Sequence, residues 1–255
     1  MSSPGSRFFK RSASPGAAAA EAAGLEWLRE ARGARVVRVL GVSDDGIELE
    51  ALSHARPTAT AARAFGAALA RTHDAGAASF GAPPDGWAGP CFLGRQELPV
   101  SSGERPWGEF YASDRVLFYL DRAERRGHVT SDEAALVRRA CERIASGEFD
   151  DGDRPSRLHG DLWNGNVVWT AEGAVLIDPA AHGGHRETDL AMLDLFGCPH
   201  LDEIVTGYQE SHPLRTGWRE RLPLHQLHPL AVHAASHGRS YAAPLASATR
   251  TVLAL

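Results

Sequence analysis

The stretch His159-Gly160-Asp161-Leu162-Trp163-Asn164-Gly165-Asn166 decides how the rest of the chain is interpreted. Asp161 and Asn166 have the D-x-x-x-x-N spacing of a kinase catalytic loop. In such a loop the aspartate accepts the proton of the substrate hydroxyl, and the asparagine holds a magnesium ion. A lone Asp more often caps a helix or a turn. The kinase interpretation therefore requires a second oxygen ligand further along the chain.

Asp178 supplies that ligand in the prediction. It follows the apolar run Val175-Leu176-Ile177, which predicts a strand, and Val167 to Trp169 predicts a partner strand. A hairpin of these two strands would bring Asp178 back to Asn166. Carboxylate and amide oxygens are ligands that Mg²⁺ accepts. We therefore predict that Asp161 is the catalytic base and that Asn166 and Asp178 are the metal ligands.

His159 is interpreted as a supporting residue. In a catalytic loop a histidine at this position usually holds the loop through hydrogen bonds and packing, so it is not predicted to be a base or a metal ligand.

The front of the chain predicts a nucleotide clamp. Arg7 to Lys10 reads as a short strand, and Pro15 to about Ala31 reads as a helix that carries Glu21. Lys10 would reach the nucleotide phosphates, and Glu21 would orient it as an ion pair. Surface Lys and Glu side chains are usually only solvated charges. This prediction therefore depends on the catalytic loop downstream.

Two further residues are predicted to bind the nucleotide through the backbone. The strand from Ile47 to Leu52 is expected to enter a linker whose backbone groups hydrogen-bond adenine. Glu50 and Leu52 are therefore candidate nucleotide-binding positions.

The order of predicted elements indicates an α+β, protein-kinase-like fold of two lobes. Residues 1–52 form a small strand-rich N-lobe, 53–57 an interlobe linker, and 58–255 a large, mainly helical C-lobe with a short hairpin in its middle. The strands of the N-lobe include Val36 to Val42 and Ile47 to Leu52, and the predicted helices of the C-lobe include 58–75, 107–126 and 131–147. Gly76 to Pro106, rich in Gly and Pro, is predicted to be loop.

Composition narrows the class of partner. The 255 residues carry a net charge of −5 and no block of Lys or Arg, which argues against a nucleic-acid groove and favours a small-molecule partner. Three widely spaced cysteines predict neither a disulfide framework nor a zinc site, and they fit a reducing cytoplasm. No apolar run is long enough to predict a membrane span.

The same residues, taken together, resemble the fructosamine (ketosamine) kinase family. The carriers of the resemblance are His159 to Asn166, with Trp163 after the Asp-Leu pair, and the run Gly184-His185-Arg186-Glu187-Thr188-Asp189-Leu190-Ala191-Met192. Both features distinguish the chain from choline kinases and aminoglycoside phosphotransferases. The likeness extends over nearly the whole chain from Phe8 onward.

The resemblance implies an activity and assigns roles. The family transfers phosphate from ATP, with Mg²⁺, to the sugar hydroxyl of ketosamines, the Amadori products on amines and lysines, as a deglycation step. By this likeness Lys10 and Glu21 clamp the nucleotide, Asp161 is the base, Asn166 and Asp178 hold the metal, and Trp163 forms a wall for the sugar.

One departure from the family pattern concerns the start of the chain. The family has a Gly-rich, phosphate-covering hairpin before the strand with the lysine, whereas only Met1 to Ser6 precede Arg7 here. Without that hairpin, ATP binding should weaken and Phe8-Phe9 should lie on an apolar sheet edge. A misplaced start, a natural truncation, or cover by another segment would each explain it.

Two alternative functions stay open at this stage. The chain could phosphorylate another amine-bearing or hydroxylated metabolite, because the substrate wall cannot be read from the sequence. It could also be a catalytically impaired nucleotide-binding protein, because of the absent hairpin.

Overall fold

The structure is a computed structural model that describes residues 7–101 and 103–255. Its contacts divide into two compact units, Met1–Ser102 with Pro155–Leu214 and Gly103–Arg154 with Arg215–Leu255. The expected lobe boundary at 53–57 divides the chain differently and stays a prediction. Met1 to Ser6, on which the expectation about the absent hairpin depends, lie outside the described residues.

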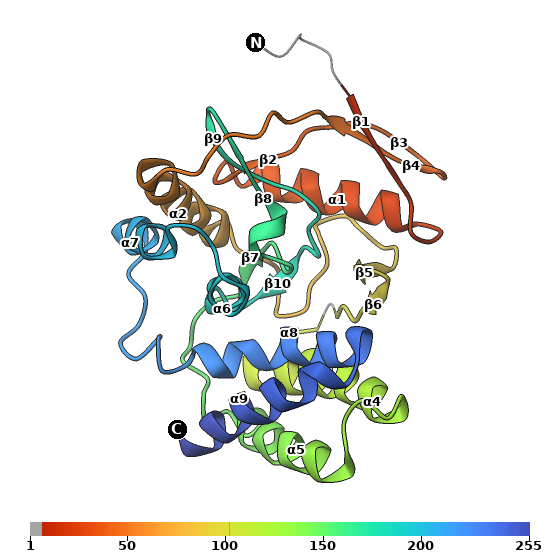
Figure 1. Cartoon of the computed structure of the whole chain (residues 1–255), viewed down its shortest axis with the longest axis vertical. Coiled ribbons are helices and arrows are strands. Elements are labelled where there is room, and N and C mark those ends of the chain that lie inside the picture. The colour runs from red at the N-terminus through yellow and green to blue at the C-terminus, as the bar shows by residue number, and fades with distance from the viewer. Residues whose placement is uncertain (1–6, 102) are drawn as a thin grey trace. The chain divides into compact units, whose positions relative to one another are not determined.

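The first unit begins with a three-stranded antiparallel sheet. Its strands are β1 (Arg7–Arg11), β3 (Val39–Ser43) and β4 (Gly46–Glu50), in the order β1-β4-β3. Helix α1 (Ala17–Glu30) packs on the sheet with Leu25 and Leu28 buried (Figure 1). These elements confirm the predicted strand, helix and hairpin. Among the described strands β1 is an edge, and Phe8 and Phe9 on it are 56% and 52% exposed.

A second sheet connects the front of the chain to the catalytic loop. Strands β8 (Val167–Thr170) and β9 (Gly173–Leu176) form the predicted hairpin, and β2 (Arg35–Val36) pairs with β9 in parallel. The predicted strand Val36 to Val42 is therefore wrong as one element. It is two strands because the chain leaves β9 after Val36 and joins β4 from Val39.

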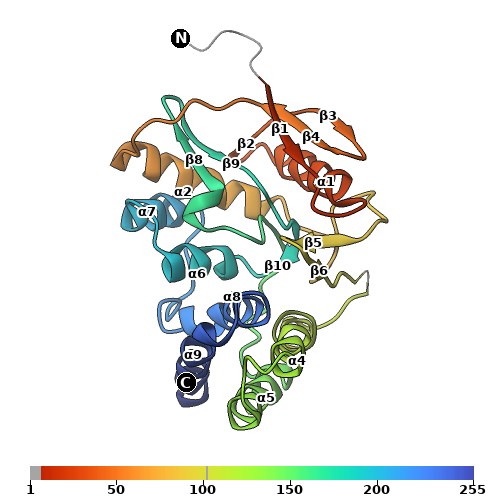
Figure 2. The same cartoon turned by 45° about the vertical axis from the view of Figure 1, so that its right-hand side comes forward.

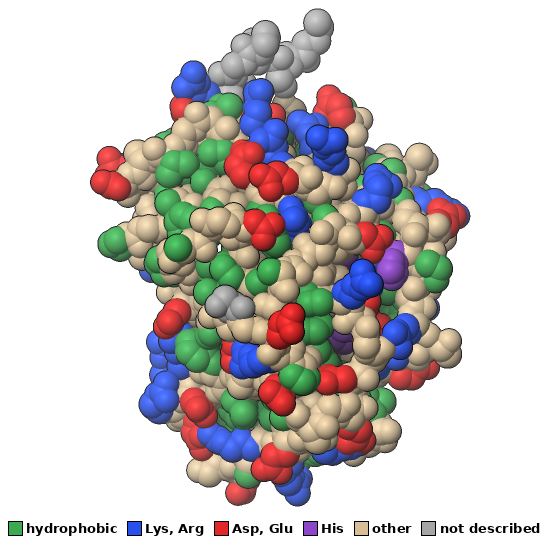
Figure 3. Space-filling view, turned by 180° about the vertical axis from the view of Figure 1, so that it is seen from behind, with side chains coloured by type: hydrophobic (Ala, Val, Ile, Leu, Met, Phe, Trp, Pro, Cys, Tyr) green, Lys and Arg blue, Asp and Glu red, His purple; other side chains and the backbone are tan. Residues whose placement is uncertain are grey.

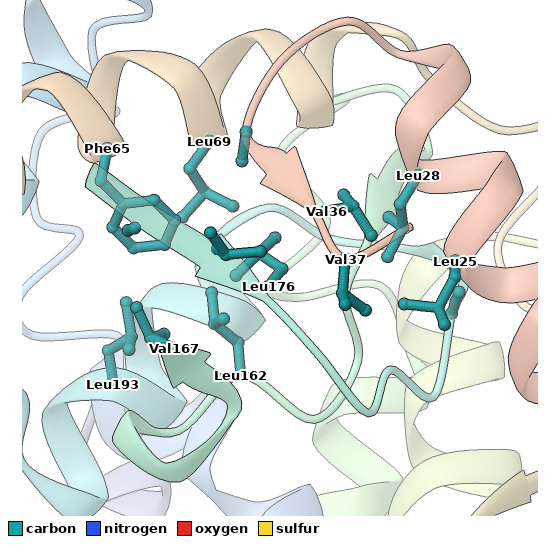
Figure 4. Packing of buried hydrophobic residues seen from close by; sticks show 14 of the residues in the cluster. Leu25, Leu28, Val36, Val37, Phe65, Leu69, Leu162, Val167, Leu176 and Leu193 are labelled. Carbon is teal, nitrogen blue, oxygen red and sulfur yellow. The ribbon is translucent and has the colours of Figure 1, made fainter. Parts of the chain in front are cut away.

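Helix α2 (Ala59–Asp74) contacts β9, α7 (Leu201–Ser211) packs against α2, and α6 (Glu187–Phe196) contacts α7. Thr58 begins α2 as its cap, because its hydroxyl accepts a hydrogen bond from the Ala61 N–H. In Figure 4, Leu162 of the catalytic loop and Val167 lie close to Leu193 of α6 within one buried apolar cluster. The catalytic loop is thus packed on the core, which holds its backbone in place.

The prediction that Gly76 to Pro106 is loop is wrong in part. Strands β5 (Cys91–Leu93) and β6 (Gln96–Leu98) form a hairpin there, next to α1 (Figure 2). The strands are only three residues long and lie among Gly and Pro, so the alternating pattern that would predict them is weak. A second unpredicted pair joins β7 (Ser156–Leu158) to β10 (His182–Gly184).

The second unit is helical throughout its described elements. A continuous rod runs from α3 (Trp107–Phe110) through a π-helical segment (Tyr111–Leu117) to α4 (Phe118–Arg125), and α5 (Ser131–Ala145) follows. These confirm the helices predicted at 107–126 and 131–147. The unit is completed by α8 (Leu222–His237), a short 3-10 turn (Arg239–Tyr241) and α9 (Ala242–Ala254).

The surface carries charges of both signs. On the face seen in Figure 3, Lys and Arg side chains are interspersed with Asp and Glu. Within the described residues, no helix combines the length and the apolar character needed to cross a bilayer.

Candidate active site

A cavity of about 380 Å³ in the first unit brings together six of the eight predicted site residues. Its size suits a small ligand. The predicted residues on its wall are Lys10, Glu21, Asp161, Trp163, Asn166 and Asp178. Glu50 and Leu52 do not line it.

Lys10 is held between two carboxylates. Its Nζ lies 2.8 Å from Oε2 of Glu21 and 2.9 Å from Oδ1 of Asp178. Burial disfavours the ammonium charge, but attraction by Glu21 and Asp178 outweighs it and raises the pKa of Lys10. The predicted ion pair is therefore present, and it extends to the residue after β9. Lys10 is a cation at neutral pH, as a phosphate ligand must be.

Asn166 joins the catalytic loop to the end of β9. Its side-chain Nδ2 donates to the Asp161 carbonyl at 2.8 Å, to Asp161 Oδ2 at 3.1 Å and to the Asp178 carbonyl at 3.4 Å. In the backbone, the Ile177 N–H donates to the Asn166 carbonyl at 3.1 Å. The β8–β9 hairpin thus returns Asp178 to Asn166, as the sequence predicts.

Asp178 has an unusual backbone. Its φ is +53°, in the left-handed region that only a few per cent of non-glycine residues adopt. Asp and Asn tolerate this region better than other residues with a Cβ. Such strain persists where the surrounding structure enforces it, and it is common at functional sites.

Asp161 has an altered acidity. Burial raises its pKa to about 7, and the negative charges of Asp178 and Asp189 act in the same direction, while the hydrogen bond from Asn166 and the charge of Lys10 oppose the shift. A carboxylate with a pKa near neutrality is suited to accept a proton at neutral pH. The geometry and the pKa of Asp161 therefore both fit a general base.

Asp189 on α6 anchors the catalytic loop from behind. Its Oδ2 accepts from the His159 N–H at 2.8 Å, and its Oδ1 accepts from the Gly160 N–H at 3.0 Å. Gly160 has φ +80° and a Cβ there would lie 2.2 Å from the Ala180 carbonyl, so this turn requires glycine. Asp189 is 1% exposed. Its two oxygens therefore fix the backbone immediately before Asp161.

A buried network extends this anchor. His73 on α2 donates from Nε2 to Asp189 Oδ2 at 3.2 Å, and its Nδ1 accepts from the Tyr208 hydroxyl at 2.7 Å. Arg186 in turn donates to the Tyr208 oxygen at 3.1 Å. Burial lowers the pKa of His73, which keeps the ring neutral in the tautomer that these bonds require. Burial opposes the charge of Asp189, but its partners lower its pKa.

This anchor was missed by the sequence reasoning. Asp189 lies in the run that carries the family resemblance, but the resemblance implied no role for this residue. The available signal was a charged residue followed directly by Leu190-Ala191-Met192, because an acid among apolar residues of a buried helix must be paired.

His159 supports the loop, as predicted. Its Nε2 donates to the Ile177 carbonyl at 2.9 Å, and its Nδ1 accepts from the Asp161 N–H at 3.2 Å. Burial lowers its pKa, so the ring is neutral. His159 connects the loop to the end of β9, and it is not among the residues that line the cavity.

Trp163 is the exposed aromatic of the site. The residue is 43% exposed, and its indole lies against the backbone of Gly165, where a Cβ would be 2.2 Å from the ring. The indole can therefore lie against this backbone only because residue 165 is glycine. Phe92 and Arg95 of the β5–β6 hairpin line the same cavity, and the sequence did not predict either one.

Glu50 and Leu52 lie elsewhere in the first unit. Glu50 ends β4 and accepts from the Arg38 N–H at 3.1 Å, while Leu52 packs partly buried against the apolar cluster. Their predicted contact with a nucleotide stays a prediction.

Comparison with known proteins gives the family. A family model described as fructosamine kinase matches residues 4–254. The chain is 35% identical to a probable ketoamine kinase of Enterococcus faecium over 180 residues, which are 70% of this chain and 62% of that protein. It is 33% identical to a probable ketoamine kinase of Thermus thermophilus, over 89% of this chain and 79% of that one. The chain thus spans less than two thirds of the E. faecium relative.

Solved structures agree with these matches. A Thermobifida fusca protein assigned as a fructosamine-3-kinase superposes with a TM-score of 0.89 at 43% identity, over 98% of this chain and 86% of that one. An aminoglycoside phosphotransferase solved with ADP and hygromycin B has a TM-score of 0.62 at 11% identity, over 92% of this chain and 82% of that one. The expected α+β, protein-kinase-like fold is therefore confirmed.

Proposed function

Since the chain belongs to the fructosamine kinase family, we propose that it transfers the γ-phosphoryl group of ATP to a sugar hydroxyl of a ketosamine. One observation carries the proposal: Asp161, Asn166 and Asp178 meet on the cavity that also holds the Lys10 ion pair. These are the parts that phosphoryl transfer needs, a base, oxygen ligands for a cation and a cation for the phosphates.

The proposed reaction uses Asp161 as the base. The attacking hydroxyl forms an O–P bond with the γ-phosphorus, the bond to the ADP oxygen breaks, and the hydroxyl proton passes to the Asp161 carboxylate. Asn166 holds the Asp161 side chain through a 3.1 Å hydrogen bond. Asp189 fixes the backbone before it. Positioning of this kind supplies most of the catalysis in phosphoryl transfer.

The side-chain oxygens of Asn166 and Asp178 are suitable ligands for Mg²⁺. Asn166 uses its amide nitrogen inside the loop, and no hydrogen bond engages its amide oxygen within the described residues. Asp178 lines the same cavity and uses Oδ1 for Lys10. An amide oxygen and a carboxylate oxygen are hard ligands of the type that Mg²⁺ prefers. Bound there, the ion would neutralise charge on the phosphate oxygens.

We further propose roles for the remaining predicted residues. Lys10, oriented by Glu21, binds the nucleotide phosphates, and Trp163 provides a flat wall for the ketosamine. The backbone around Glu50 and Leu52 receives the adenine. No disulfide joins Cys91, Cys141 or Cys198 within the described residues, which agrees with a reducing, cytoplasmic location.

The test is ATP-dependent phosphorylation of ribulosyl-lysine and fructosyl-lysine, followed by mass spectrometry of the product. Asp161→Asn is the matched inactive variant, and choline and an aminoglycoside are the competing substrates. We expect product with the ketosamines only, and only with the wild type. Transfer to choline or the aminoglycoside in preference to both ketosamines would overturn the proposed substrate class. ATP hydrolysis without any phosphorylated acceptor would overturn the transferase assignment.

A further inference from the structure

The β5–β6 hairpin places one arginine at its tip. The pair Leu93 and Gln96 closes a two-residue turn made of Gly94 and Arg95. Gly94 has φ +59° and Arg95 has no positive φ, which is the pattern of a type II′ turn with glycine in its first central position. The turn geometry therefore projects Arg95 from the end of the hairpin.

The base of the hairpin is fixed. Cys91, Leu93 and Leu98 are 6%, 8% and 2% exposed, and β5 contacts α1 (Figure 2). A short hairpin held by three buried side chains keeps its tip in one place. Phe92 and Arg95 reach the cavity from this scaffold.

Three cations line the cavity, Lys10, Arg11 and Arg95. Arg95 differs from Lys10 in having no acidic partner. Lys10 is neutralised by Glu21 and Asp178, whereas within the described residues no hydrogen bond or ion pair is found for the exposed guanidinium of Arg95. A guanidinium group binds carboxylate and phosphate through two parallel hydrogen bonds. An arginine held at a cavity wall with no internal acid is therefore available to an anionic group of a ligand.

We propose that Arg95 is a specificity-determining residue that recognises an anionic group on the ketosamine, either a carboxylate of the glycated amine or a phosphate on the sugar. The proposal rests on the proposed function and narrows its substrate class. Trp163 and Arg95 line the same cavity, so one ligand can contact an aromatic wall and a cation together. In the proposed function Lys10 binds the nucleotide phosphates, and Arg11 follows it directly on β1. Arg95 lies on a separate hairpin and is therefore the cation that we assign to the acceptor.

The test compares three ribulosamines that differ in one charged group. The adduct of glycine carries a carboxylate, and the adduct of glycinamide replaces it by a neutral amide of the same shape. The third adduct is the glycinamide compound with a phosphate on its terminal sugar hydroxyl. We expect kcat/KM of the wild type to be about tenfold higher for at least one anionic adduct than for the neutral one. The adduct that gains identifies which anion is read.

Variants at position 95 test whether Arg95 causes the higher kcat/KM for the anionic adduct. Arg95→Gln should remove the advantage of the anionic adduct, leave kcat/KM for the neutral adduct within about twofold, and leave the KM for ATP unchanged. Arg95→Lys should retain part of the advantage, because the charge stays while the paired geometry is lost. Arg38→Gln, at an exposed arginine of the same unit away from the cavity, is the matched control and should retain all of it.

Three outcomes overturn the proposal: equal kcat/KM for the three adducts, an equal loss on all of them in Arg95→Gln, or a rise only in the KM for ATP. Turnover of the neutral adduct distinguishes this proposal from the proposed function. If the wild type phosphorylates the neutral and the anionic adducts equally well, the role of Arg95 is refuted and the proposed function stands. If no adduct is phosphorylated, the proposed function fails. Calorimetric binding of the adducts to the wild type and to Arg95→Gln then still decides whether Arg95 reads the anion.

Discussion

Nζ of Lys10 lies 2.9 Å from Oδ1 of Asp178, so the first strand of the chain is ion-paired to the residue that follows β9. Oε2 of Glu21 lies 2.8 Å from the same ammonium group. The Lys10 cation, shared between a carboxylate of α1 and the carboxylate of Asp178, links β1 and α1 to the end of the β8–β9 hairpin.

Replacing Asp161 should slow transfer strongly. Asp161→Asn keeps the size of the side chain but cannot accept a proton, so we expect kcat to fall by about 10²–10⁴-fold. The measurement is steady-state turnover of the ketosamine at saturating ATP. Circular dichroism of the variant serves as the control for folding. Turnover within tenfold of the wild type would refute the role of Asp161 as the base.

The same substitution should stabilise the fold at high pH. The pKa of Asp161 is raised from 3.8 to about 7 in the folded protein, so the folded state holds this proton more tightly than the unfolded state. Stability from this group is complete below pH 3.8 and is lost as pH rises to about 7. At pH 8 without Mg²⁺, the free energy of unfolding of Asp161→Asn should therefore exceed that of the wild type by on the order of 1–3 kcal/mol. The variant should accordingly have the higher melting temperature. Equal melting temperatures at pH 8 would contradict the raised pKa.

Activity should follow the ionisation of Asp161. The base must be deprotonated, and its pKa is raised to about 7, so kcat/KM should rise with pH through about 7 and then level off. A profile from pH 5.5 to 8.5 at constant ionic strength measures this. A flat profile over that range would show that another group, or no group, limits the reaction.

The ion pair of Lys10 should control the KM for ATP. Lys10→Met should raise it by roughly 10–100-fold, because a charged hydrogen-bond donor to the phosphates is lost. Glu21→Gln should have a smaller effect, since Asp178 still holds the ammonium group at 2.9 Å. Arg7→Gln is the matched control on the same strand, where the cation pairs with Glu48 at the surface. An equal effect of all three variants would argue against a specific clamp.

Loosening the anchor of the catalytic loop should slow the reaction without weakening ATP binding. Asp189→Asn retains one acceptor oxygen for two backbone N–H donors and removes the charge, so we expect kcat to fall by about 10–100-fold with the KM for ATP within about threefold. Asp194→Asn, exposed on the same helix, is the control. A rise in the KM for ATP without a change in kcat would show that Asp189 does not position the base.

The contact between α2 and α7 should tolerate no side chain at Gly66. A Cβ there would lie 1.8 Å from the Ile204 carbonyl oxygen, so the two helices touch through their backbones. Gly66→Ala should therefore lower the free energy of unfolding by at least about 2 kcal/mol, measured by chemical denaturation. Gly103→Ala is the control, because a Cβ at Gly103 meets nothing within 4 Å. Its stability should stay within about 0.5 kcal/mol of the wild type.

The sequence alone determined most of the helices, the β8–β9 hairpin and which polar residues that hairpin brings together. The spacing of Asp161 and Asn166, and the apolar run before Asp178, are short-range patterns, and a hairpin converts them into proximity with little freedom. The fructosamine kinase family was identified from Trp163 within His159 to Asn166 and from the run Gly184 to Met192. The pair of Lys10 and Glu21 was predicted from the short strand and the helix at the front of the chain.

Only the tertiary structure decided which distant residues complete the site. Asp189, His73 and Tyr208 come from three helices and meet around one buried carboxylate, which no sequence spacing encodes. The hairpin that carries Arg95 is too short for its strand pattern to be visible, and α1 and the buried residues at its base hold it in place. Burial, which the sequence does not specify residue by residue, also sets the pKa of Asp161.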